Sequence, residues 1–136
     1  MAFGFHPYVG LPNLPRAEWQ LQLPALRQFV LDKAGIPTGE EEAFGPFDAR
    51  LDDRHFDDGF AVLEEPATFS LMGADRRITV EFLSGYRYVQ IFAPKGKDLV
   101  ALEPMTAPTN ALVSGRGLTL VEPGGRFQAV FQLRVD

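Results

Sequence analysis

Two titratable side chains that are far apart in the sequence lie next to prolines, and both could take part in acid–base chemistry. His6 precedes Pro7, and a following proline favours an extended backbone, so we expect His6 on a strand. Glu103 follows the apolar run 99–102 and precedes Pro104, which predicts a carboxylate at the end of a buried strand. A histidine and a glutamate can act together as general acid and general base, although each is also common as a structural or solvent-facing residue.

The segment 52–60 adds four aspartates, one arginine and one histidine within nine residues. It can be an acidic turn held by side-chain-to-backbone hydrogen bonds. The aspartates lack the regular spacing of a calcium-binding loop, so we expect no metal site. Carboxylates accept hydrogen bonds from adjacent sugar hydroxyls, and aromatic side chains can face the apolar side of a sugar ring. An acid–base pair beside an acidic, aromatic cleft therefore suggests a carbohydrate ligand.

Strands rather than helices are expected to position these residues. Thirteen glycines and 11 prolines are spread along the 136 residues, which limits uninterrupted segments to strand length. Apolar and polar residues alternate in 19–23, 78–82 and 127–135, where only Val130 breaks the pattern, and 86–92 and 99–102 resemble further strands. Residues 26–33 also fit a short helix, and Glu40–Glu42 is expected in a solvated loop. The sequence thus predicts one all-β domain over 1–136, mostly antiparallel.

The composition excludes several classes of function. Thirteen basic against 18 acidic residues give a net charge of −5, which opposes nucleic-acid binding. The sequence has no cysteine, so disulfides, thiolate metal sites and thiol nucleophiles are excluded. No apolar run approaches the roughly 18 residues of a membrane span, and residues 1–7 lack the features of a signal peptide. We therefore expect a cytoplasmic protein that binds neither nucleic acid nor membrane.

Three motifs carry a resemblance to a known family. They are residues 5–8 (FHPY), residues 56–60 (FDDGF) and, above all, residues 102–111 (LEPMTAPTNA), followed by Gly117-Leu118 and Pro123-Gly124. In this order they resemble the C-terminal half of aldose 1-epimerases, the galactose mutarotase-like proteins, over essentially the whole chain. The resemblance implies a β-supersandwich that holds a free aldose in a cleft and interconverts its α and β anomers without a cofactor or metal. It also implies a hexose ligand such as galactose or glucose.

The resemblance also implies roles for the matching residues. Glu103 matches the family's base on the anomeric hydroxyl, and His6 matches the acid for the ring oxygen. The family holds the sugar with an aspartate in an Asp-x-x-Phe context, which both Asp57 and Asp53 fit, and we prefer Asp57. Tyr8, in the same motif as His6, is a further candidate for substrate binding.

The chain departs from the family in one large way, because the N-terminal half, which supplies an arginine, a second histidine and many strands, has no match in it. We therefore expect either a fragment or a chain completed by a partner, including a homo-oligomer. Two other functions stay open. One is a truncated, non-catalytic carbohydrate-binding sandwich that needs a partner chain, and the other is a purely structural β-domain.

Overall fold

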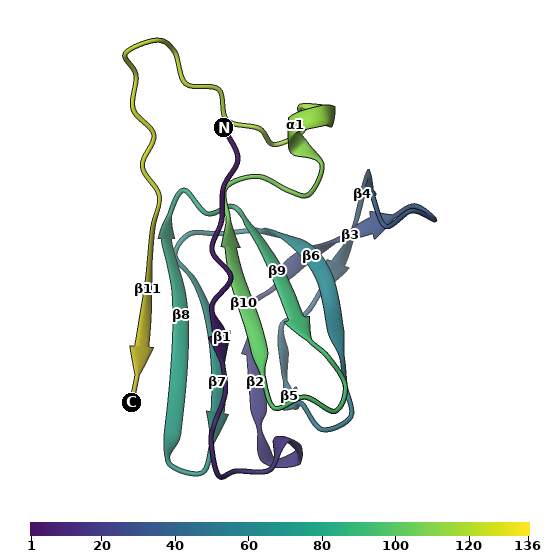
Figure 1. The fold of residues 1–136 in the computed structure, drawn as a ribbon, viewed down its shortest axis with the longest axis vertical. Coiled ribbons are helices and arrows are strands. Elements are labelled where there is room, and N and C mark those ends of the chain that lie inside the picture. Colours follow the sequence, from purple (N-terminus) through teal and green to yellow (C-terminus); the bar gives the residue numbers. More distant parts are fainter.

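Two β-sheets face each other in the computed structural model, which describes residues 1–136 (Figure 1). The six-stranded sheet has the order β1-β10-β9-β6-β3-β4, the five-stranded sheet has the order β11-β8-β7-β2-β5, and all strand pairs are antiparallel. The strands are β1 (Tyr8–Val9), β2 (Gln20–Leu23), β3 (Leu26–Leu31), β4 (Pro37–Phe44), β5 (Phe47–Arg50), β6 (Phe56–Val62), β7 (Ala67–Gly73), β8 (Arg76–Ser84), β9 (Tyr88–Ala93), β10 (Val100–Met105) and β11 (Val130–Val135). A 3₁₀ turn (Arg16–Glu18) and the single-turn helix α1 (Ala111–Ser114) complete the chain, and neither could cross a membrane.

The hydrophobic core lies between the two sheets and is built from alternate residues of their strands. In the six-stranded sheet, Leu102 of β10 pairs with Ile91 of β9, and both are fully buried. Phe69 of β7 and Val80 of β8 are paired and buried in the same way in the other sheet. Burial of this apolar surface is the main stabilising term, about 25 cal/mol per Å². The residues between these core positions point to the outer face of each sheet, where they are free to form a site.

The predicted all-β, antiparallel fold is confirmed. Strands occur at each of the alternating segments, with ends that differ by a few residues. The segment predicted as 127–135 pairs with β8 only from Val130, and the register shifts between Val130 and Phe131. The residue that breaks the alternation in the sequence therefore marks an irregularity in the strand pairing, as expected when one extra residue is inserted into a ladder.

The structure decides one open alternative and overturns one expectation. Residues 26–31 form β3 and not a helix, because the segment pairs with β4 on one side and with β6 on the other. Glu40–Glu42 lies within β4 and not in a loop. β4 is an edge strand of the six-stranded sheet, and exposed charges on an edge strand discourage pairing with other chains, which explains how an acidic run can be both solvated and extended.

The N-terminal segment runs along β10 (Figure 1). Gly4 forms an isolated bridge with Met105, and further along Tyr8 of β1 pairs with Ala101. A Cβ atom at Gly4 would lie 2.7 Å from the carbonyl oxygen of Pro104, so this close approach requires glycine. His6 lies between the bridge and β1, outside the strand that the sequence predicts for it, because only the residues on either side of it pair with β10.

Candidate active site

His6 and Glu103, the two predicted catalytic residues, are in direct contact. His6 Nε2 lies 3.0 Å from Glu103 Oε1. Glu103 is the fourth residue of β10 and not its end, as the sequence predicted, because the strand continues through Pro104 to Met105. Since Leu102 points into the core, Glu103 points to the outer face of the sheet, where the N-terminal segment carries His6.

The surroundings of the pair make the carboxyl group of Glu103 unusual. Its side chain is only 14% exposed, whereas that of His6 is 47% exposed. Burial raises the pKa of Glu103, the nearby His6 partly offsets the rise, and Asp57 adds to it. A carboxylate whose pKa is raised from its ordinary value holds a proton more strongly, which suits a general base that works near neutral pH.

A hollow of about 330 Å³ opens beside the pair. Its walls are the N-terminal segment 2–6 on one side and Glu103, Met105, Ala107 and Pro108 on the other. Small-molecule sites usually occupy about 300–1,000 Å³, so this hollow has room for a small ligand only.

A polar row continues from Glu103 across the outer face of the sheet. Gln90 of β9 is paired with Glu103 on one side and with Gly59 of β6 on the other. Asp57 lies two residues from Gly59 and thus on the same face, and its Oδ1 accepts a hydrogen bond of 3.0 Å from Gln90 Nε2. A Cβ at Gly59 would lie 2.8 Å from the ring of Phe29 and 3.1 Å from Gln90 Oε1, so glycine makes room for this row.

Gln90 is the residue of this face that the sequence analysis missed. The alternation along 86–92 places Gln90 on the sheet face that is opposite to the face of Val89 and Ile91. That pattern does not say which strands lie beside Gln90. Only the pairing of β9 with β10 and β6 puts its amide between Glu103 and Asp57.

The remaining predicted residues are placed as follows. The Tyr8 ring is exposed and packs against the His6 ring, with centroids 4.5 Å apart and a tilt of 35°. Asp53 lies in the turn before β6, where Lys95 Nζ is 3.7 Å from Oδ2. Of the two aspartates that fit the same motif, Asp57 is therefore the one that shares a sheet face with Glu103. No group of three or more Asp, Glu or His side chains could hold a metal ion.

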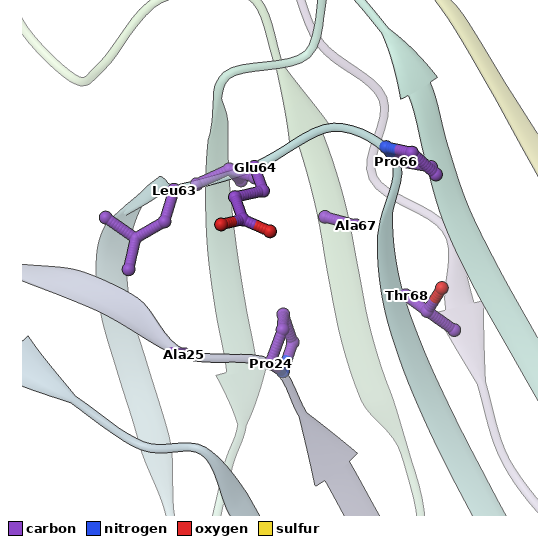
Figure 2. Close-up of a pocket in the computed structure, with 8 residues that line it drawn as sticks. Pro24, Ala25, Leu63, Glu64, Pro66, Ala67 and Thr68 are labelled. Atoms are coloured by element: carbon purple, nitrogen blue, oxygen red, sulfur yellow. The ribbon is translucent and has the colours of Figure 1, made fainter.

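A second hollow, of about 380 Å³, lies between the β2–β3 junction and the β6–β7 connection (Figure 2). Its lining is formed by residues 24–25, 62–64 and 66–68, and Figure 2 shows Glu64 pointing toward Pro24. Glu64 is the only ionisable side chain in this lining, so the hollow offers no acid–base pair. The face that carries His6, Gln90 and Asp57 is thus the better candidate for chemistry.

Comparisons with known proteins bear on the fold of this site. The structure superposes on a galactose mutarotase-like protein from Clostridium acetobutylicum with a TM-score of 0.83 and 17% identity, covering 100% of this chain and 47% of that one. The chain has the galactose mutarotase-like fold. A galactose mutarotase related enzyme from Lactobacillus acidophilus has the same fold, with a TM-score of 0.76 and 20% identity, covering 100% of this chain and 52% of that one.

Among curated proteins, the chain is 25% identical over 139 residues to the uncharacterized protein YihR of Escherichia coli strain K12, covering 96% of this chain and 44% of that protein. No family model matches the chain. The predicted resemblance to galactose mutarotase-like proteins is confirmed at the level of the fold, and a match to their C-terminal half fits the coverage. The chain spans about half the length of the mutarotase-like proteins that it matches.

Proposed function

We propose that the site binds a free hexose, such as galactose or glucose, and interconverts its α and β anomers, which is the activity of an aldose 1-epimerase. The observation that carries the proposal is the 3.0 Å contact between His6 and Glu103 on the open face of a mutarotase-like sheet. An exposed imidazole beside a shielded carboxylate with a raised pKa provides one proton donor and one proton acceptor at the same point.

The chemistry needs no group beyond these two. Glu103 removes the proton from the anomeric hydroxyl O1, and His6 gives a proton to the ring oxygen O5 as the C1–O5 bond breaks. The products of this step are an open-chain aldehyde, a protonated Glu103 and a neutral His6. Rotation about C1–C2 presents the other face of the aldehyde, and ring closure returns both protons. Each positioned acid or base contributes about 10² to 10⁴ in rate.

The residues along the polar row are assigned to sugar binding. With C1 at the acid–base pair, the far side of the ring points along the sheet toward Gln90 and Asp57. The Asp57 carboxylate can accept hydrogen bonds from adjacent hydroxyls, and the amide of Gln90 already holds this carboxylate in place. The exposed ring of Tyr8 stacks against His6 and offers an apolar surface beside the anomeric end.

The alternative function is a non-catalytic, sugar-binding sandwich that becomes active only with a partner chain. It is favoured by the length of the chain, which is about half that of the mutarotase-like proteins that it matches. In that case the face described above would bind the sugar, and groups on the partner would be needed for turnover.

Polarimetry on freshly dissolved α-galactose and α-glucose tests the proposal, together with NMR titration of the same sugars. We expect the 136-residue chain to accelerate mutarotation and Glu103→Gln to lower the rate at least about 10²-fold with little change in sugar affinity, because the amide keeps the shape and loses only the base. Glu64→Gln, in the hollow of Figure 2, is the matched control and should keep full activity.

The outcomes separate the functions. Binding without acceleration supports the sugar-binding alternative, and an unchanged rate in Glu103→Gln contradicts the assignment of the base. If no sugar binds, both functions are wrong.

A further inference from the structure

Two walls flank the sheet face that carries Asp57 and Gln90, and together with this face they bound a cleft. One wall is the β3–β4 hairpin, and the other is the connection from β10 to β11, which includes α1; Figure 1 shows both at the same end of the molecule. Arg116, just after α1, donates a hydrogen bond from its guanidinium to the carbonyl oxygen of Thr38 in β4. This contact joins segments that are far apart in the sequence.

Gly39 is what allows the guanidinium to reach the hairpin. A Cβ atom at Gly39 would overlap the guanidinium of Arg116, so any other residue would push the arginine away. Gly39 also has a φ of +99°, a conformation that side chains disfavour. The contact therefore depends on two residues, one on each wall.

A hollow of about 210 Å³ lies beside Pro37, the residue that precedes Thr38. Its floor is the sheet face at Asp57, Gly59 and Gln90, its side is formed by hairpin residues between 29 and 37, and Thr109 closes it from the other wall. The hairpin is rigid at its tip, where Asp32 Oδ1 accepts hydrogen bonds of 2.8 Å from the Ala34 N–H and 2.9 Å from the Ile36 N–H. The space beyond Asp57 is thus bounded on several sides and narrow.

We propose that Arg116 is a specificity-determining residue, because its contact with Thr38 closes the cleft at the Asp57 end and limits the ligand to a single sugar ring. The inference rests on the proposed function. With C1 of the sugar held at His6 and Glu103, C4 points toward Asp57, so a second sugar linked at C4 would have to pass between the two walls. The contact blocks that path.

The experiment compares the binding of glucose with that of maltose, a disaccharide that keeps a reducing glucose and extends it at C4. Affinities are measured by NMR titration of the 136-residue chain and of Arg116→Ala and Gly39→Ala, which break the contact from opposite sides. Arg126→Ala, another exposed arginine of the same connection, is the matched control. Hydrogen exchange of peptides covering 37–44 and 107–117 reports independently whether the walls have separated.

We expect the unchanged chain to bind glucose at least about tenfold more tightly than maltose. Both contact variants should exchange faster in the two peptides and bind maltose about tenfold more tightly than the unchanged chain, with glucose affinity within about threefold. Arg126→Ala should change nothing. If exchange accelerates but maltose binding stays weak, or if the unchanged chain already binds both sugars alike, the inference is wrong while the proposed function stands. If neither sugar binds, the proposed function fails, and this inference fails with it.

Discussion

Glu103 is held in surroundings that favour its protonated form, and this has a consequence for stability. Because burial raises the pKa of Glu103 in the folded chain, the fold favours the protonated carboxyl group over the charged one. The stability gained from this is fully present below 4.5, the ordinary pKa of the group, and is lost as the pH rises through the raised pKa. Glu103→Gln keeps the uncharged shape at every pH. We therefore expect Glu103→Gln to gain stability relative to the unchanged chain between pH 4 and pH 7.

Urea denaturation at several pH values checks this prediction, with Glu64→Gln as the control because its carboxyl group is exposed. The difference in free energy of unfolding should grow with pH for Glu103→Gln and stay flat for the control. A difference that shrinks with pH would mean that the pairing with His6 outweighs burial at Glu103.

The same pair predicts a bell-shaped pH profile for mutarotation. In the proposed mechanism the active form has Glu103 ionised and His6 protonated, so we expect activity to fall on the acid side when Glu103 takes up a proton and on the alkaline side when His6 loses one. Since the pKa of Glu103 is raised, the acid limb should lie above that of a free glutamate. His6→Asn should lower the rate about 10²- to 10⁴-fold and remove the alkaline limb, measured by polarimetry across the pH range. A flat profile would count against His6 as the acid.

At the scale of the elements, His6 reaches Glu103 only because the N-terminal segment lies close to β10 at Gly4. A Cβ in Gly4→Ala would lie 2.7 Å from the Pro104 carbonyl oxygen, so the segment must move outward and carry His6 with it. We expect Gly4→Ala to lower kcat/KM for mutarotation at least about tenfold, because small misplacements of catalytic groups are costly.

The matched control for Gly4→Ala is Gly96→Ala in the β9–β10 turn. Gly96 has a φ of +73° but open space around it, so this substitution introduces backbone strain of about 1 kcal/mol or more without touching the N-terminal segment. It should lower the free energy of unfolding while leaving kcat/KM unchanged. Equal kcat/KM values in the two variants would show that the position of the segment does not control the acid.

The strands that carry the site could be predicted from alternation, because a sheet with one buried face repeats every two residues. The resemblance in the order of motifs supplied the galactose mutarotase-like fold and named His6, Glu103 and Asp57 as candidates. The pattern of residues 26–31 could not separate a strand from a helix, because Leu26, Phe29 and Val30 fit both periods. Only pairing with β4 and β6 decides this.

Relations between distant segments could not be predicted at all. Gln90 is an ordinary polar residue of an alternating strand until its register places it between Glu103 and Gly59. Similarly, nothing in the acidic run near Gly39 indicates that Arg116 will lie over it, because that contact depends on how the hairpin and the α1 connection are oriented on the finished sheet.

At the scale of the whole molecule, the core reaches the edge of the five-stranded sheet and is left uncovered there. Leu133 and Val135 of β11 pair with the core residues Val80 and Ile78 and so point to the same side, yet they are 46% and 68% exposed. β11 is also an edge strand with one unpaired side. Exposed apolar side chains beside unpaired backbone groups favour association with another chain.

We therefore expect the chain to form a dimer or a larger oligomer at micromolar concentration, measured by sedimentation velocity. Leu133→Lys should shift the population toward the monomer, because a charge on an edge strand opposes both apolar contact and strand pairing. Leu120→Lys, at an exposed position of the β10–β11 connection, is the control and should leave the distribution unchanged. A compact monomer at all concentrations would show that this edge needs no cover. Dissociation by Leu133→Lys with mutarotation retained would show that the face with His6 and Glu103 works without a second copy.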